Sequence, residues 1–290
     1  MDERAALALV ADAIPEAGDD AAVVDGQVLT IDMLHKSTDF PDGTTRYTAG
    51  WRAVGASLSD VAAMGAEATA AVAAYGATGF DHEELSAFVE GASDACELVN
   101  AQYVGGDLDA HEEFTVATAA LGWTDSPVYR SGASPGNVVC VTGTLGRSAA
   151  ALRAFEDGDP EGGNELFRFE PRVQAGAELA EYATAMMDSS DGLARSLHQL
   201  ASASGCGFEI ESGTVPIDDA VRAMAPSESE ALDMSLFFGE DFELVFTAPE
   251  SALPRIRRVV DAPVTVVGEV TNGGVVLDGK PLPDRGYTHL

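Results

Sequence analysis

Short apolar runs alternate along this chain with longer stretches in which apolar residues recur every third or fourth position. The short runs predict eight strands, over 21–24, 28–32, 69–75, 114–121, 138–142, 208–211, 243–247 and 264–270. The longer period predicts helices over 46–64 and 83–99, and a third helix after Asp191. Because strands and helices interleave, the pattern favours an α/β or α+β fold.

Turn-forming residues divide the chain near its middle. The stretch TDSPVYRSGASPGN, at 124–137, separates two halves that each hold strands and helices. A chain of 290 residues exceeds what one core usually covers, so we expect two domains, 1–135 and 136–290. The charged stretch EDGDPEGGNE, at 156–165, predicts a surface loop.

The composition is strongly acidic, with a formal net charge of −32. Only two of the 16 cationic side chains are lysines, and the charge is spread from end to end. Nucleic acid is excluded as a partner, because binding its backbone needs clustered cations. Two interpretations remain: an acidic surface for a basic partner, or adaptation to high salt. The even spread favours a halophilic protein.

Further exclusions follow from what the sequence lacks. No run of 18 apolar residues occurs, so we expect no membrane span. The start, MDERAALALVADAIPE, has no positive region of a signal peptide, which predicts a cytoplasmic protein. Cys96, Cys140 and Cys206 lie far apart in apolar stretches, and we expect buried free thiols.

Acidic motifs carry the candidate chemistry. Aspartates lie in the glycine- or serine-flanked motifs GDDAAV (18–23), TIDMLHKSTDF (30–40), SLSDVAAMGA (57–66), GGDLDA (105–110) and MDSSDGLA (187–194). Mg²⁺ is bound by a few carboxylates together with substrate phosphates. The set therefore predicts a metal-dependent enzyme of phosphate chemistry.

Each motif also has an ordinary structural interpretation. GDDAAV alone is better read as a turn before a strand, and Asp60 is equally a helix cap or a satisfied polar group. Asp188 and Asp191 are spaced to face one ion at a strand-to-helix junction, or to cap that helix. Only the joint occurrence favours a metal site. P-loop, GxSxG, HExxH and GxGxxG motifs are all missing.

These motifs are joined along the chain by two further stretches, RSGASPGNVVCVTGTLGRSAA and FGEDFELVFT. In content and order the whole set resembles the motifs of the thiamine-monophosphate kinase family. That family lies in the superfamily of aminoimidazole ribonucleotide synthetase and selenophosphate synthetase. The resemblance runs from Gly18 to the terminal GYTHL. It implies a two-domain PurM-like fold, an N-terminal sheet domain that dimerises and binds ATP and Mg²⁺, and a C-terminal α/β domain. It also implies ATP-dependent conversion of thiamine monophosphate to thiamine diphosphate within a homodimer.

The resemblance implies site residues position by position. The Mg²⁺ ligands would be Asp20, Thr30, Asp32, Asp60, Asp107, Asp188 and Asp191. ATP contacts would be Arg130, Ser190, Gly106 and Asp107, and the thiamine side would hold Asp39, Glu240, Asp241 and Tyr287. Asp188, Asp191 and Arg130 would act in catalysis. One departure is Asp39, which stands where many bacterial members carry His.

The expected reaction is direct in-line transfer. The acceptor is a phosphate monoester with a second pKa near 6, so it needs no strong base at neutral pH. Metal ions and Arg130 would offset repulsion between the two polyanions. Aminoimidazole ribonucleotide synthetase stays open as an alternative, as does a non-enzymatic acidic ion-binding protein. Selenophosphate synthetase would need a reactive cysteine near the N-terminus, and none precedes Cys96.

Overall fold

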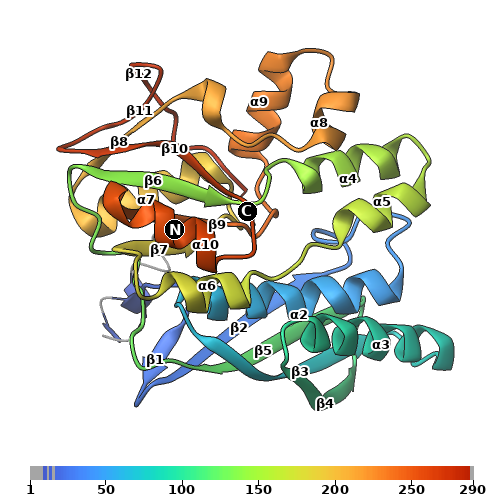
Figure 1. Cartoon of the computed structure of the whole chain (residues 1–290). Helices are drawn as coiled ribbons and strands as arrows, with labels where there is room; N and C mark the ends of the chain where they lie inside the picture. The colour runs from blue at the N-terminus through green and yellow to red at the C-terminus, as the bar shows by residue number, and fades with distance from the viewer. Residues whose placement is uncertain (1–8, 12, 15–16, 288–290) are drawn as a thin grey trace.

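The computed structural model describes residues 9–11, 13–14 and 17–287 (Figure 1). Its strands are β1 Ala22–Val24, β2 Gln27–His35, β3 Glu67–Ala77, β4 Gln102–Ala110, β5 Thr115–Trp123, β6 Asn137–Thr142, β7 Ala185–Asp188, β8 Gly207–Ile210, β9 Leu244–Pro249, β10 Val264–Thr271, β11 Val275–Leu277 and β12 Lys280–Pro281. Its helices are α2 Arg46–Ala63, α3 His82–Leu98, α4 Arg147–Glu156, α5 Pro160–Phe167, α6 Val173–Leu179, α7 Leu193–Ser204, α8 Asp219–Met224, α9 Glu228–Phe237 and α10 Leu253–Val259, with 3₁₀ turns at Ser212–Thr214 and Glu250–Ala252.

Five strands of the N-terminal half form one sheet in the order β1-β2-β5-β3-β4. Helices α2 and α3 cover one face, and the alternation along the strands places Val28, Leu34 and Val116 against them. The two helices approach closely because both carry glycine at the contact. A Cβ at Gly50 would lie 2.1 Å from the carbonyl oxygen of Phe88.

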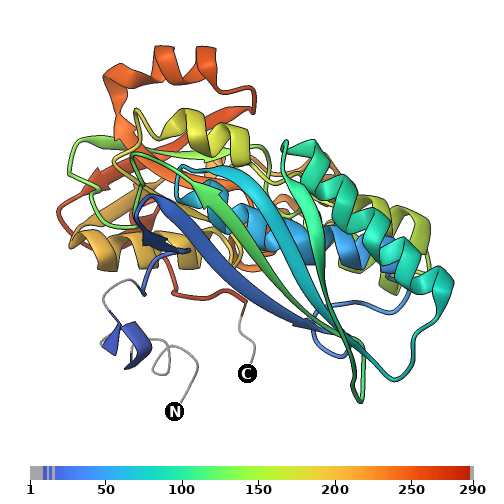
Figure 2. The same ribbon diagram turned by 90° about the horizontal axis from the view of Figure 1, so that it is seen from below.

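The opposite face of this sheet is exposed and apolar. Leu29, Ile31 and Met33 alternate with the buried residues of β2, and Ile31 is 73% exposed. Figure 2 shows the face from below, with the long strands in front of α2. Exposed apolar patches on proteins are often sites of interaction.

The C-terminal half holds a seven-stranded sheet in the order β12-β11-β8-β10-β6-β9-β7. Its pairs are antiparallel except for β11 with β8. A core that includes Leu197, Phe208 and Ile210 lies between this sheet and α7. Figure 1 shows this layer above the N-terminal helices. The expected boundary at 135/136 falls between the end of β5 at Trp123 and the start of β6 at Asn137.

All eight predicted strands and the three predicted helices are present. The surface loop expected over 156–165 was wrong, since most of it forms α5. Asp159 caps that helix by accepting from the amide of Gly162, and Pro160 occupies its first turn. Strands β4, β7, β11 and β12 and most C-terminal helices were not predicted.

The cysteine prediction was right for two of three residues. Cys96 and Cys140 are buried and free, whereas Cys206 is free but half-buried. Among the helices of the described residues, none has the length and apolar character needed to cross a membrane.

Candidate metal and phosphate site

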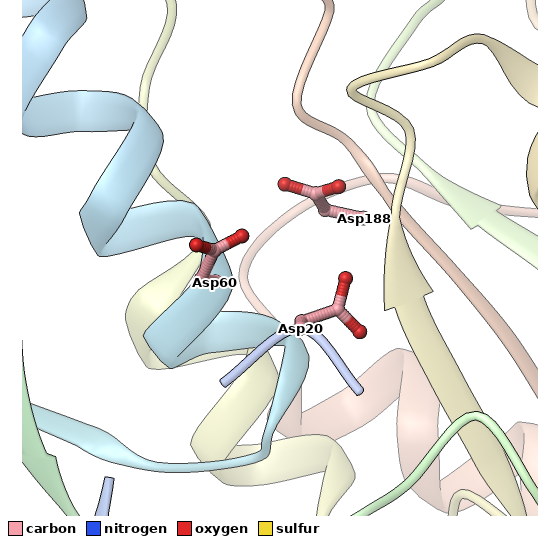
Figure 3. A group of neighbouring side chains, drawn as sticks. All are labelled: Asp20, Asp60 and Asp188. Carbon is pink, nitrogen blue, oxygen red and sulfur yellow. The ribbon is translucent and has the colours of Figure 1, made fainter. Parts of the chain in front are cut away.

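Three segments from both halves of the chain bring carboxylates together. Asp20 lies in the loop before β1, Asp60 in the last turn of α2, and Asp188 at the end of β7. One oxygen from each lies within 4.8 Å of the others. Figure 3 shows the three side chains as neighbours that come from different parts of the fold. The group therefore depends on α2 meeting the edge strand of the second sheet.

Hydroxyl groups hold two of these carboxylates in place. Thr30, on the buried side of β2, donates to Asp60. Ser59, the neighbour of Asp60 in α2, donates to Asp188 at 2.8 Å. Ser190 donates to the other oxygen of Asp188 from its backbone amide at 3.1 Å and from its hydroxyl at 2.8 Å. These hydrogen bonds orient Asp60 and Asp188 without cancelling their charges.

Burial and mutual repulsion disfavour the ionised forms. Burial raises the pKa of Asp60 well above its usual range, and the charges of Asp32, Asp188 and Asp20 raise it further. The pKa of Asp188 rises to about 7, chiefly through burial and then through Asp20. Crowded, desolvated carboxylates of this kind need a cation to remain ionised together. The donor set fits Mg²⁺, which prefers hard oxygen ligands.

Arg130 borders the cluster. Its Nη2 and Nε donate to the two oxygens of Asp20 at 2.9 and 3.2 Å, and its backbone amide donates to Asp19 at 2.7 Å. Burial alone would lower the pKa of Arg130, but Asp20, Asp19 and Asp188 raise it overall. The guanidinium is thus a fixed positive charge beside the cluster.

Two further predicted ligands lie at the edge of this group. Asp32 accepts a hydrogen bond of 2.8 Å from Ser57, and its charge acts on Asp60. Asp191 follows the cluster in the loop before α7, where its carboxylate accepts from Gln199 at 3.3 Å. Neither belongs to the three-carboxylate group.

Gly106 and Asp107 lie on β4, away from the three-carboxylate group. Asp107 is exposed on the edge strand β4 and is aligned across the sheet with Ala74, Ala117 and Met33. Three strand spacings of about 4.8 Å place it roughly 14 Å from β2. Aligned residues share a face, and Met33 belongs to the exposed face, so Asp107 points away from Asp32 and Asp60. Gly106 and Asp107 line a cavity of about 360 Å³ between α3 and β4.

The residues expected on the thiamine side form a second group. Asp39 is buried and accepts from the Tyr287 hydroxyl at 3.0 Å, and Glu240 acts electrostatically on that hydroxyl. Burial, with these carboxylates, raises the pKa of Tyr287. Asp241 instead accepts from two amides at the start of α4, so its contribution is to hold the loop that carries Glu240.

Arg52 was missed by sequence reasoning. It lies on α2, is 1% exposed, and its Nη2 is 2.6 Å from the Glu240 carboxylate. Its Nη1 donates to the backbone carbonyl of Phe167, and its guanidinium carbon lies 3.6 Å from the centre of the aromatic ring of Phe167. The available signal was a cation inside the apolar pattern of a helix.

Ser57, Ser59 and Asp19 were also missed as parts of the site. All three belong to motifs that were recognised, SLSD and GDD, but the hydroxyl groups and the first aspartate were not assigned roles. Serines that precede an aspartate in a helix are ordinarily exposed. Here α2 is covered on several sides, and both serines are fully buried.

Comparison with protein families gives two matches that together cover most of the chain. Residues 18–124 match the family model of the AIR synthase related protein, N-terminal domain. Residues 134–279 match the model of its C-terminal domain.

Individual relatives are similar over the whole chain. A thiamine-monophosphate kinase of Halobacterium salinarum is 61% identical, with all of both chains covered. One of Methanospirillum hungatei is 40% identical over all of this chain and 99% of the relative. A solved structure of AaThiL complexed with AMPPCP and TMP superposes with a TM-score of 0.91 at 28% identity, covering 100% of this chain and 97% of that one.

Proposed function

The chain belongs to the thiamine-monophosphate kinase family, and we propose that it transfers the terminal phosphoryl group of ATP to thiamine monophosphate, giving ADP and thiamine diphosphate. The observation that carries the proposal is the partly buried group of Asp20, Asp60 and Asp188, bordered by Arg130, in a chain 61% identical to such a kinase. Carboxylates plus one arginine suit the transfer of a phosphoryl group between two anions.

Mg²⁺ is the proposed cofactor. Asp20, Asp60 and Asp188 would hold it, with Thr30, Asp32 and Asp191 completing the ligand set around the phosphates. Bound there, it supplies positive charge that offsets the repulsion between the two phosphates and orients them. Thr30 and Ser59 keep two of the carboxylates aimed at the shared centre. Such preorganisation is what makes charge stabilisation effective in a water-poor site.

The transfer is proposed to be direct and in-line. Thiamine monophosphate is already mostly dianionic at neutral pH, so its phosphate oxygen attacks without a base. Arg130 is proposed to contact an ATP phosphate; its guanidinium lies beside the cluster and presents a planar set of donors, which supports this role. Ser190 is proposed as a second ATP contact; it lies in the loop before α7 next to Asp188.

Charge also supports the assignment of the thiamine side. The thiazolium ring of thiamine carries a permanent positive charge, and Asp39 and Glu240 place two carboxylates near one another there. Tyr287 adds an aromatic ring to the same group. An acidic, partly aromatic environment favours an organic cation. We therefore assign Asp39, Glu240 and Tyr287 to substrate binding, with Asp241 holding the Glu240 loop.

A homodimer would bring Asp107 into the site. Strand β1 pairs only with the first three residues of β2, so Thr30–His35 form a sheet edge in the described chain, and β4 forms the other edge. The exposed face between these edges is apolar. If two copies close these sheets around that face, β4 of one lies along β2 of the other. Gly106 and Asp107 of one copy would then lie beside the partner's β2, the strand that carries Thr30 and Asp32, and we propose that they contact the partner's metal and nucleotide from there.

The proposal also covers the domain organisation, the location and the salt adaptation of the protein. We propose residues 1–135 as the ATP- and Mg²⁺-binding and dimerisation domain, and residues 136–290 as a second domain that adds Asp188, Ser190 and Asp191 to the site. The proposed location of the protein is the cytoplasm, where its co-substrate ATP is found. The net charge of −32 and the 61% identity to a Halobacterium salinarum kinase support a halophilic protein.

The test is a kinetic assay of the full chain in 2 M KCl with ATP, MgCl₂ and thiamine monophosphate. We expect ADP and thiamine diphosphate in equal amounts, with no product when either Mg²⁺ or thiamine monophosphate is left out. ADP release with formylglycinamidine ribonucleotide in place of thiamine monophosphate would instead indicate an aminoimidazole ribonucleotide synthetase. Divalent-ion uptake without any turnover would indicate an ion-binding protein.

A further inference from the structure

The last described segment, residues 282–287, lies across α7, and we call it the C-terminal strap. Arg195 of α7 fastens it in two ways. Its Nη1 donates to the carbonyl oxygen of Tyr287 at 3.1 Å, and its Nε lies 3.4 Å from the Asp284 carboxylate. Arg195 is only 8% exposed, so these contacts are shielded from water.

The strap also touches the loop that carries Asp191. The amide of Tyr287 donates to the carbonyl oxygen of Asp191 at 3.1 Å. A Cβ at Gly286 would lie 2.2 Å from that same carbonyl oxygen and 3.0 Å from the Cβ of Arg195. Only glycine at this position allows the strap to lie so close to the loop.

The other end of this connection is the thiamine side. The Tyr287 hydroxyl donates to Asp39. The amide of Glu240 donates to the carbonyl oxygen of Ser190 at 2.6 Å. The loop of Ser190 and Asp191 is therefore hydrogen-bonded through its backbone to both segments that carry Tyr287 and Glu240. A shift of either segment must move the loop or break one of these bonds.

We propose that the C-terminal strap couples the binding of thiamine monophosphate to the binding of metal and nucleotide, with Gly286 and Arg195 as positioning residues. A substrate that packs against Tyr287 holds the strap on α7, which holds the Asp191 loop beside the metal site. By linkage, ATP and Mg²⁺ tighten the binding of thiamine monophosphate by the same factor. The inference rests on the proposed function, which assigns Tyr287 to the substrate and Asp191 to the metal.

Calorimetric titration of the full chain with thiamine monophosphate in 2 M KCl tests the coupling. The affinity is measured with and without saturating AMPPCP and MgCl₂. We expect the wild type to bind at least about fivefold tighter with the analogue, the low end of usual coupling factors. In Gly286→Ala the ratio falls below about twofold. Gly273→Ala is the matched control, because a Cβ there meets nothing within 4 Å, and it keeps the wild-type ratio.

Arg195 gives a second, independent variant in case Gly286→Ala does not fold. Arg195→Ala is expected to lower the ratio as Gly286→Ala does, and Arg195→Lys, which keeps the charge beside Asp284, to restore part of it. Arg222→Ala on α8 is the control. An unchanged ratio in Arg195→Ala and Gly286→Ala, or equal wild-type affinities with and without AMPPCP, overturns the inference. Wild-type turnover without coupling would overturn the strap alone and leave the kinase proposal standing.

Discussion

The Arg52 guanidinium on α2 lies 2.6 Å from the carboxylate of Glu240, so an ion pair joins the two halves of the chain. Glu240 has a backbone φ of 62°, and the nearby Phe242 one of 54°, in a region that side chains rarely adopt. Such a backbone persists only when its surroundings hold it. Arg52, which also contacts Phe167 and Ser148, supplies part of that support.

We therefore expect Arg52→Met to destabilise the protein by about 3–5 kcal/mol, the cost of removing one partner of a buried pair. Urea unfolding in 2 M KCl measures the change. The KM for thiamine monophosphate should also rise, because the Glu240 side chain loses the ion pair with Arg52 that orients it. Arg153→Met is the control, since the Arg153–Glu156 pair is exposed and 3.7 Å apart. Equal unfolding midpoints for the two variants would contradict this role.

Asp188→Asn should abolish most turnover while leaving the fold intact. It removes one ligand charge at nearly constant volume, and we expect kcat to fall at least about 100-fold, the scale for losing one preorganised charge-stabilising group. Mg²⁺ should raise the melting temperature of the wild type and not that of the variant. Asp233→Asn, an exposed change on α9, provides the comparison. A variant that retained both activity and the Mg²⁺ response would remove Asp188 from the site.

Asp107 and Asp60 allow a test of sites shared between two copies. Asp107→Asn and Asp60→Asn should each be inactive as homodimers. A heterodimer of the two holds one site with both aspartates intact, so about half of the wild-type activity per dimer should return. If Asp107 acted within its own chain, every site would carry one change and the mixture would stay inactive. Ile31→Glu places a charge on the exposed sheet face and should prevent dimerisation. Light scattering should then show monomers, and the kinetic assay should show no activity.

Salt should stabilise the protein. A charge of −32 repels itself within the folded state, and this repulsion is screened over about 3 Å at 1 M ionic strength. We expect the free energy of unfolding to rise by about 2 kcal/mol between 0.1 and 2 M KCl, which is roughly 4–8 °C in melting temperature. Full stability and activity in dilute buffer would refute the halophilic interpretation.

The buried thiols should be chemically inert. Burial raises the pKa values of Cys96 and Cys140 to about 12, so the reactive thiolate is scarce at pH 8. Iodoacetamide should therefore label the native protein at Cys206 at most, and all three cysteines after unfolding in guanidinium. Mass spectrometry distinguishes the sites. Rapid labelling of Cys140 in the native state would mean that the β6 region opens readily.

Local sequence patterns predicted much of the fold, because apolar alternation and helical spacing are strong where one face is buried. Strand β4 escaped, since an exposed edge strand with two glycines lacks that alternation. Helix α5 was not predicted, because its two glycines disfavour a helix. The sequence feature that could have indicated it is the capping residue Asp159. The motifs pointed to Asp60 and Asp188 separately. Their meeting across the two sheets depends on tertiary packing, which no local pattern encodes.

The three carboxylates do not come from one half of the chain: Asp20 and Asp60 precede the stretch at 124–137, and Asp188 follows it. A cation bound among them would connect the two halves of the chain at the contact between α2 and β7. Removing it with a chelator should therefore weaken this contact as well as stop the reaction. Faster amide exchange along β7 and the last turn of α2, well before global unfolding, would be its signature.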